Sequence, residues 1–380
     1  MKKIIVAIDS FKGSLTSAEA NAAVRDGLLQ ALPDSEITCL PISDGGEGLV
    51  AVLTGLTHGR YLTRHVTGPC GETVAARIGL SGIDDGTAFI ELASAAGLPL
   101  VPPQKRNPLH TTTRGVGELM MEALRLGKRR LILGIGGSAT NDAGTGLLAA
   151  LGYRFLDKSG RELPATGASL ATIARVDASR RSPLLDNAVI EVACDVTNPF
   201  YGPLGAACVF APQKGADPHE VGLLDEGLRT FARLIREVTG TDVSQLPGAG
   251  AAGGVGGALA AFLHARLHPG IDFILDALRF DELLDGADLV ISGEGHADRQ
   301  SAMGKVVSGI LRRTLPRHKP LILFCGGYED AAALNAAGIT AVFSITPGPV
   351  TLAQAMDKPF ALRHLTETAR QAGNVLACFS

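Results

Sequence analysis

Glycine combined with a polar or acidic residue recurs where apolar runs of this chain end. The segments are residues 9–14 (DSFKGS), 43–48 (SDGGEG), 136–142 (GGSATND) and 293–298 (GEGHAD), and the run 189–194 likewise ends in an acid, Asp195, without a glycine. Glycines before a helix let backbone N–H groups point at an anion, which the helix dipole also favours. Carboxylates in the same place would repel that anion unless a cation lay between them. The combination therefore indicates a site for a phosphate group and Mg²⁺.

Two common signatures of phosphoryl-transfer enzymes are missing. The sequence has no G-x-x-x-x-G-K-[ST] loop, because Arg299 stands where the first glycine before Gly304-Lys305 would be. It has no protein-kinase catalytic loop either. A kinase built on this chain would therefore belong to neither of the two common classes.

Residues 134–139 (GIGGSA) indicate an alternative function, the binding of a dinucleotide. They fit the G-x-G-x-x-[GA] dinucleotide fingerprint, follow an apolar run and precede a predicted helix, and Asp157 lies at a suitable distance. Glycine-rich chains match this pattern by chance, and here it lies mid-chain rather than at the first strand. A nicotinamide-dependent oxidoreductase of a small hydroxy acid, using this loop, is the alternative hypothesis. A third is a non-catalytic protein that binds a phosphate or sugar acid.

Elements at both chain ends can bring these residues to one sheet. At the start, apolar runs 4–8 and 37–42 alternate with predicted helices 17–32 and 46–56, the first capped by Thr16 or Ser17. At the end, runs 287–292, 321–325 and 341–345 alternate with predicted helices 303–315, 330–337 and 358–378. This alternation is typical of parallel sheets. The five runs predict one doubly wound parallel sheet, with ligands at the carboxyl ends of its strands.

The middle of the chain predicts a second α/β domain. Its strand-like runs are 88–92, 130–135 and 189–194, and its helix-like runs are 116–126, 144–151, 221–238 and 258–267. The 380 residues exceed the size at which a single core usually stops growing. We therefore predict an α/β protein of two unlike domains, residues 1–60 plus 281–380 and an inserted mixed α/β domain at 61–280.

The composition argues against several classes of partner and location for this protein. The formal net charge is −3 without a long basic block, which argues against a nucleic-acid surface. No apolar stretch is long enough to cross a bilayer, and Asp9 and Gly13 interrupt the first run too early for a secretory signal. Six cysteines without CxxC spacing indicate reduced thiols and favour the cytoplasm. His264 and His268, four apart on a predicted helix, lack the Glu of a zinc-protease motif, so zinc is not expected.

Seven segments together resemble the bacterial type 1 glycerate kinase family. They lie in family order along nearly the whole chain, as residues 9–20 (DSFKGSLTSAEA), 43–48 (SDGGEG), 134–146 (GIGGSATNDAGTG), 193–200 (ACDVTNPF), 211–216 (APQKGA), 247–254 (PGAGAAGG) and 292–305 (SGEGHADRQSAMGK). The resemblance implies ATP-dependent phosphorylation of (R)-glycerate to 2-phosphoglycerate. It also implies a flavodoxin-like domain built from both chain ends and an inserted domain likened to restriction endonucleases.

Four positions depart from the family pattern. Leu49 replaces a Thr, Ala143 replaces a Gly, Ser43 replaces an Ala, and His296 stands where an Arg is usual in GEGR. The last change matters most, because Arg is a permanent bidentate phosphate donor and His is not. Arg299 is a candidate substitute for a phosphate contact at that position.

Phosphoryl transfer requires positioning, charge neutralisation and an acceptor for the hydroxyl proton. Asp195 is the expected acceptor, because an ordinary Asp is ionised at neutral pH. Lys12 is the second predicted catalytic residue. Asp44, Glu294 and Asp298 are the predicted Mg²⁺ ligands, directly or through water.

The remaining predicted residues would bind ATP or the hydroxy acid. They are Ser10, Gly45, Gly46, Gly136, Gly137, Ser138, Asn141, Lys214, Gly295 and Lys305. Ordinary structural roles stay open for many of these residues: Asp195 can bond nearby amides, the other acids can form turns, Asn141 can cap a helix, and lysines are commonly solvated. The oligomeric state is left open by the sequence.

Overall fold

The computed structural model describes residues 2–11, 13–42, 48–297 and 306–378. Its contacts divide the chain into a terminal unit (Met1–Asp44 and Ile271–Ser380) and an insert unit (Gly45–Gly270). The chain passes from one unit to the other at residues 44/45 and 270/271. Both points lie earlier in the sequence than the predicted boundaries after residues 60 and 280. The first difference has a clear cause, because helix α2 (Leu49–Leu56) packs on strands of the insert unit.

The terminal unit holds one sheet of five parallel strands in the order β13-β12-β11-β1-β2. The strands are β1 (Lys3–Ile8), β2 (Glu36–Cys39), β11 (Leu289–Ala297), β12 (Leu321–Tyr328) and β13 (Ala341–Ser344). All residues of β1 after Lys3 are buried, as expected for a strand covered on both faces. The prediction of one parallel sheet from both chain ends is confirmed.

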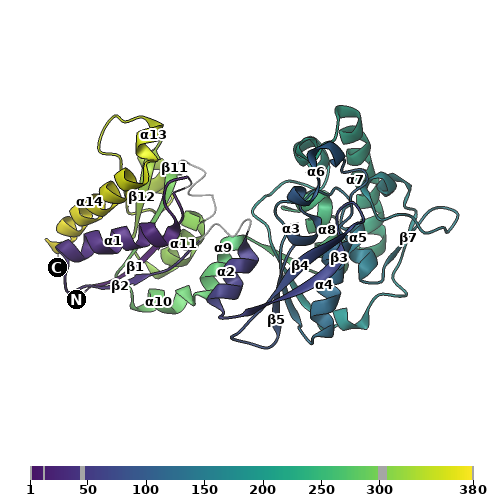
Figure 1. Cartoon of the computed structure of the whole chain (residues 1–380), viewed down its shortest axis with the longest axis horizontal. Helices are drawn as coiled ribbons and strands as arrows, with labels where there is room; N and C mark the ends of the chain where they lie inside the picture. Colours follow the sequence, from purple (N-terminus) through teal and green to yellow (C-terminus); the bar gives the residue numbers. More distant parts are fainter. Residues whose placement is uncertain (1, 12, 43–47, 298–305, 379–380) are drawn as a thin grey trace. The chain divides into compact units, whose positions relative to one another are not determined.

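The helices of the terminal unit flank this sheet. They include α9 (Gly270–Ala277), α10 (Phe280–Gly286), α11 (Val306–Thr314), α12 (Ala331–Ala336) and α13 (Leu352–Ala355). Helices α1 (Ser17–Ala31) and α14 (Lys358–Ala377) lie side by side (Figure 1). A Cβ on Gly27 of α1 would lie 2.2 Å from the Thr366 carbonyl oxygen, so the close approach requires glycine. Thr16 caps α1 in a capping box with Glu19, in agreement with the prediction.

Strand order reverses direction between β1 and β11. The chain steps from β1 to β2 one way along the sheet and from β11 to β12 the other way. Because such connections are right-handed, α1 and α11 cover opposite faces. The carboxyl ends of β1 and β11 therefore border a topological switch point, where ligands of open α/β sheets usually bind.

The insert unit holds a mixed six-stranded sheet in the order β10-β9-β6-β5-β4-β3. Its strands are β3 (Arg60–Thr67), β4 (Thr73–Leu80), β5 (Thr87–Glu91), β6 (Arg130–Gly134), β9 (Val189–Ala193) and β10 (Arg266–His268). β5, β6, β9 and β10 are parallel, whereas β3, β4 and β5 pair antiparallel. The sequence located β5, β6 and β9 but missed the β3–β4 hairpin and β10.

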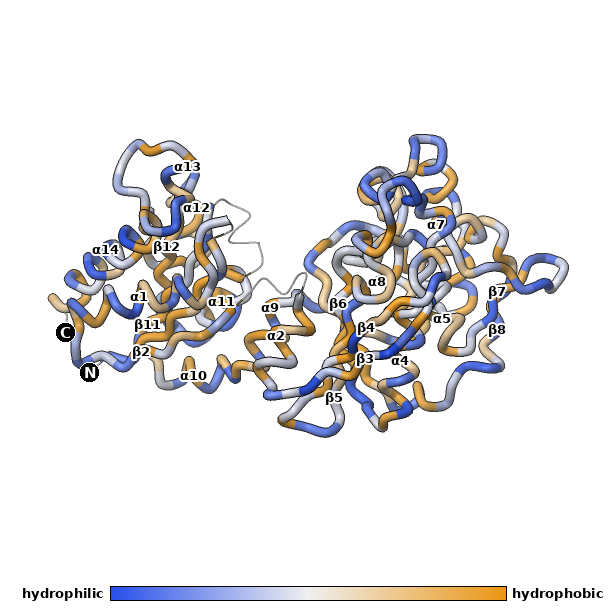
Figure 2. Tube along the Cα trace, in the orientation of Figure 1, coloured by the Kyte–Doolittle hydropathy of each residue, from blue (hydrophilic) through white to orange (hydrophobic). Residues whose placement is uncertain are grey.

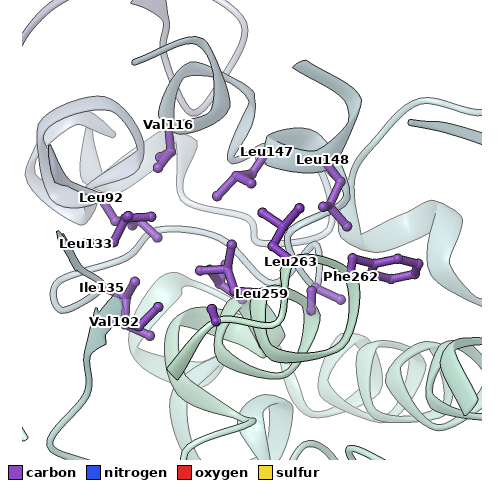
Figure 3. Packing of buried hydrophobic residues seen from close by; sticks show 14 of the residues in the cluster. Leu92, Val116, Leu133, Ile135, Leu147, Leu148, Val192, Leu259, Phe262 and Leu263 are labelled. Atoms are coloured by element: carbon purple, nitrogen blue, oxygen red, sulfur yellow. The ribbon is translucent and has the colours of Figure 1, made fainter. Parts of the chain in front are cut away.

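Helices pack around this second sheet. They are α2, α3 (Ala93–Ala96), α4 (Arg114–Arg125), α5 (Thr145–Ala150), α6 (Ala206–Phe210), α7 (Pro218–Thr239) and α8 (Ala251–Leu263), with a small hairpin of β7 (Arg154–Leu156) and β8 (Arg175–Asp177). Apolar side chains of α4, α5 and α8 gather over β6 and β9 in one core (Figure 3). Leu133, Leu147 and Leu259 are examples, each at most 1% exposed.

The predicted helix 258–267 is wrong at its end. His264 has the left-handed φ of 51° and caps α8, and β10 then begins at Arg266. His264 and His268 therefore do not share a helix. Figure 2 shows the hydropathy along the chain, with apolar residues concentrated in the central strands of the terminal sheet. Among the described residues, none of the helices combines the length and apolarity needed to span a membrane.

Candidate functional site

The carboxyl ends of β1 and β11 carry acidic residues side by side. Asp9 follows β1, and its N–H donates to the Gly293 carbonyl of β11 over 3.0 Å. The Ser10 N–H in turn donates to Asp9 Oδ1 over 2.6 Å. Glu294 and Gly295 continue β11 at the same level of the sheet. The switch point of the terminal sheet is thus bordered by two carboxylates and a serine.

A cavity of about 560 Å³ opens at these strand ends, and its lining residues in the described part of the chain belong to the terminal unit. Its polar lining includes Asp9, Ser10, Ser14, Glu294, His296 and Thr346, and its apolar lining includes Phe11, Val306, Ile345, Leu352, Met356 and Phe360. An apolar wall beside polar strand ends suits a ligand with a flat apolar body and a charged tail. This apolar wall was not predicted from the sequence, because most of it comes from the loops and helices after β12 and β13.

The predicted residues of the terminal unit fall into two groups. Ser10, Glu294 and Gly295 line this cavity. Lys12, Asp44, Gly45, Gly46, Asp298 and Lys305 lie outside the described residues. Within the described part of the chain, no three His, Cys, Asp or Glu side chains cluster as a metal site would need.

His296, at the position where the family pattern has Arg, lines the same cavity. Its Nε2 lies 3.5 Å from Oε1 of Glu329, and both side chains are more than half exposed. A neutral imidazole cannot replace the fixed charge of a guanidinium. Phosphate binding at this position therefore lacks the permanent cation that the family pattern supplies.

A second set of polar groups lies at the carboxyl ends of the parallel strands of the insert unit. Glu91 ends β5 and pairs with Gly134 of β6, which in turn pairs with Ala193 of β9. Gly136 and Asp195 each lie two residues beyond that last pair. Neighbouring strands are about 4.8 Å apart, so Glu91, the glycine loop and Asp195 follow one another along this edge.

The glycine loop, which we define as Gly136–Ser138, presents amides at this edge. The Leu98 N–H donates to the Gly137 carbonyl over 2.9 Å, and the Ala139 N–H donates to the Ala96 carbonyl over 2.8 Å. Gly136 and Gly137 are exposed, and Gly137 has a φ of 69°. Among the described residues, the three N–H groups of the loop donate to no protein acceptor. They are therefore available to an anion.

The dinucleotide fingerprint predicted at residues 134–139 is contradicted by this geometry. That motif requires the glycine turn to open directly into a helix. Here β6 ends at Gly134, and the next helix, α5, begins only at Thr145. Ten residues intervene, so the helix N-terminus is not placed against the glycines.

Lys214 supports the glycine loop from inside the protein. Its side chain is only 3% exposed, and its Nζ donates to Ser138 Oγ and to the Thr140 carbonyl, each over 2.7 Å. Burial lowers the pKa of Lys214 from 10.5 to about 7, although the nearby Asp142 carboxylate opposes the change. The predicted ligand-binding lysine is thus placed behind the loop.

Asp142 ends the predicted segment 136–142 but is not among the predicted binding residues. It is fully buried and accepts hydrogen bonds from Thr113 N (2.8 Å), Thr113 Oγ1 (2.8 Å), Gly144 N (3.1 Å) and Gly146 N (3.2 Å). Burial raises the pKa of this carboxyl, and the hydrogen bonds act against that rise. The neighbouring Asn141 is also fully buried, and its amide atoms have no partner in the part of the chain that the structure describes.

Comparison with known proteins places this chain among one group of enzymes. The model of the "Glycerate kinase family" matches residues 4–377. A glycerate kinase of Bacillus subtilis is 46% identical over 97% of this chain and 96% of its own length. A glycerate 2-kinase of Escherichia coli is 46% identical over 93% of each chain. A crystal structure of a Salmonella typhimurium LT2 protein, assigned as glycerate kinase 2, superposes with a TM-score of 0.82 at 44% identity, covering 99% of this chain and 98% of the other.

Proposed function

Because the chain belongs to the glycerate kinase family, we propose that it transfers the γ-phosphoryl group of ATP to the 2-hydroxyl of (R)-glycerate, giving 2-phosphoglycerate and ADP. The observation that carries this proposal is the family match over residues 4–377. The choice of the 2-hydroxyl follows the relative from Escherichia coli, which is named a glycerate 2-kinase.

ATP is assigned to the cavity of the terminal unit. Phe11, Ile345, Met356 and Phe360 provide the apolar surface that a purine needs. Ser10 and the backbone of Gly295 lie at the switch point, where phosphates of nucleotides commonly bind. Lys12 and Lys305 are the cations proposed to neutralise the phosphates.

Mg²⁺ is proposed to bind beside these phosphates, with Glu294, Asp44 and Asp298 as its ligands. Hard carboxylate oxygens are the donors that Mg²⁺ prefers, and Asp9 adds a second described carboxylate to the cavity. When bound, the ion would neutralise charge on the transferring phosphoryl group. Glu294, near the carboxyl end of β11, is one of the residues that line the cavity.

Glycerate is assigned to the edge of the insert sheet. Its carboxylate would accept hydrogen bonds from the Gly136, Gly137 and Ser138 amides, which are held in place from behind by Lys214. Asp195, next to this loop, would accept the proton of the reacting hydroxyl. Asn141, whose buried amide atoms have no partner among the described residues, is proposed to bind the substrate beside this loop.

Finer aspects of classification follow from the same resemblance. The order β2-β1-β11-β12-β13 matches the 2-1-3-4-5 arrangement of flavodoxin-like sheets, so we assign the terminal unit to that fold and the mixed insert to a restriction-endonuclease-like one. All six cysteines are free thiols, which supports a reducing compartment such as the cytoplasm.

A coupled assay with ATP, Mg²⁺ and (R)-glycerate tests the proposed function. ADP release should depend on glycerate, and ³¹P and ¹³C NMR should identify 2-phosphoglycerate as the product. Release of 3-phosphoglycerate would contradict the assigned hydroxyl. Turnover with NAD(H) but none with ATP would contradict the kinase assignment altogether.

A further inference from the structure

Two carboxylates at the edge of the insert sheet hold the backbone at the two points where the chain crosses between units. Glu91 Oε1 accepts a hydrogen bond from the Gly48 N–H over 2.6 Å. Asp195 Oδ1 accepts one from the Gly270 N–H over 2.9 Å. Gly48 is the first described residue after the crossing at 44/45, and Gly270 is the last residue before the crossing at 270/271.

The Glu91 contact satisfies the amide of the N-cap residue of α2, as the N3 carboxylate does in a capping box. Gly48 is the N-cap of α2 and has a φ of 91°, which only glycine adopts without strain, and it has no side chain to accept from the helix amides. The carboxylate of Glu91, supplied by β5, binds the amide of this N-cap residue from outside the helix. A negative charge at a helix N-terminus also interacts favourably with the helix dipole.

Beyond the Asp195 contact, the residues after Gly270 are held by contacts within the terminal unit. Immediately after Gly270, a Cβ on Gly309 of α11 would lie 2.7 Å from Ile271, so these two residues are in tight contact. The carboxylate of Asp272 then pairs with Arg312 at 2.9 Å. The chain is thus held within the insert unit up to residue 270 and within the terminal unit from residue 271.

We propose that Glu91 is a positioning residue, which with Asp195 forms a pair of backbone anchors on either side of the glycine loop. β6, which carries the loop, lies between β5 and β9, which carry the anchors. The same sheet edge therefore fixes the loop and the exit points of both crossing segments. For the reaction this inference rests on the proposed function, since the loop is assigned to glycerate. The anchoring itself does not depend on that assignment.

Three variants separate anchoring from a direct chemical role. In Glu91→Ala the acceptor is lost, and the Gly48 amide should exchange with deuterium about ten- to a hundredfold faster, the range that a hydrogen bond to a charged group contributes. In Glu91→Gln the amide oxygen can still accept, so exchange should stay within a few-fold of wild type. Glu118→Ala is the matched control, because Glu118 accepts from another backbone amide of the insert, Thr67 N, over 2.8 Å.

Exchange is read at single-residue resolution by fragmentation mass spectrometry on the full chain without substrates, so the result stands whether or not glycerate is the substrate. The control should speed exchange at Thr67 and leave Gly48 unchanged. Asp195→Ala and Asp195→Asn provide the same comparison at Gly270. Unchanged exchange of Gly48 in Glu91→Ala would overturn the anchor.

Steady-state kinetics add a second readout. If Glu91 acts through its hydrogen bond, Glu91→Ala should lower kcat/KM for glycerate at least tenfold, and Glu91→Gln should restore most of the loss. A Gln variant as inactive as the Ala variant, with its Gly48 amide still protected, would show that the charge itself is needed. Glu91 would then be a ligand of substrate or metal and not a positioning residue.

Discussion

The buried lysine behind the glycine loop makes the stability of the protein depend on pH in a specific way. Burial lowers the pKa of Lys214 from 10.5 to about 7. Between these values the unfolded chain binds a proton on this lysine that the folded chain lacks, so the free energy of unfolding must rise with pH. The full difference amounts to about 5 kcal/mol. This destabilisation is present at and below neutral pH and disappears toward pH 10.

The structure explains why the neutral amine fits this position. A neutral amine carries two N–H donors, and Lys214 Nζ has two acceptors at 2.7 Å, Ser138 Oγ and the Thr140 carbonyl. The protonated form has a third N–H and a full charge in a site that is only 3% exposed. The Asp142 carboxylate stabilises that charge only in part, and burial outweighs it.

The test compares wild type with Lys214→Met in urea unfolding at several pH values. Between pH 7 and pH 9 the wild type should gain about 2 kcal/mol relative to the variant. Tyrosine fluorescence follows the relevant transition, because Tyr61, Tyr153 and Tyr201 are three of the four tyrosines and lie in the insert unit, and the chain has no Trp. Lys158→Met, at an exposed lysine of the same unit, is the control.

The two results lead to different conclusions. The free energy of unfolding of the wild type, minus that of Lys214→Met, should rise with pH, and the same difference for the control variant should stay constant. This result would support a lysine that is buried and deprotonated near neutral pH. A difference that stays constant from pH 7 to pH 9 would refute the reasoning. The Lys214 amine would then be reached by solvent in the folded protein.

Three further predictions concern single residues. Ala143→Gly should raise the free energy of unfolding by about 0.5–1 kcal/mol in urea titrations, because Ala143 is buried with a left-handed φ of 50°. The control Ala258→Gly, inside α8, should instead lower the free energy of unfolding by about 1 kcal/mol. Leu352→Asp should raise the KM for ATP about tenfold (about 1.4 kcal/mol) by placing a negative charge in the cavity lining; Leu204→Asp, at a similarly exposed leucine of the insert, should leave it unchanged. Asp195→Asn should lower kcat by about 10²–10⁴-fold without shifting the unfolding midpoint, and a near-normal rate would remove Asp195 from the role of proton acceptor.

The terminal unit was predictable because its central strands are buried on both faces. Such strands appear as continuous apolar runs, and β1 and β12 are examples, each ending at glycines or polar residues that mark the edge. The cap of α1 was visible as Thr16 followed three residues later by Glu19. Local signals were sufficient here, since each element carries its own pattern.

The β3–β4 hairpin was missed for the opposite reason. β3 lies at the sheet edge, and only one of its eight residues is buried. Its sequence, RYLTRHVT, mixes charged and apolar residues and has no apolar run. β10 was missed because it has three residues and directly follows an apolar helix. The left-handed His264 that ends α8 and the pairing of β10 with β9 distinguish the strand from a continuation of that helix, and neither can be read from the sequence.

The strand-end acids and the glycine loop can be named as candidates from the sequence, but the side chains that lie behind them cannot. Glu91 ends an apolar run like the other strand-end acids, and that signal could have identified it. Its partner, Gly48, is 43 residues away in sequence, so the anchor becomes visible only in three dimensions. Lys214 is similar, because its burial results from contacts with residues 74 and 76 positions earlier. A lysine in a polar segment gives no sequence signal of such burial.

The polar groups behind the glycine loop have one consequence in common, which is that they hold the proposed anion-binding loop in place. Binding an anion with backbone amides is effective when the amides already point at it and need no reorganisation. The loop is fixed by the bridge from Ser138 to Gly97, by the two hydrogen bonds of Lys214, and by the segment that Asp142 holds through four donors. An apolar interior would cost less stability at neutral pH than a buried lysine and carboxylate. It would, however, leave the Ser138 hydroxyl and the Thr140 carbonyl without partners, and the loop would lose the contacts that set the direction of its amides.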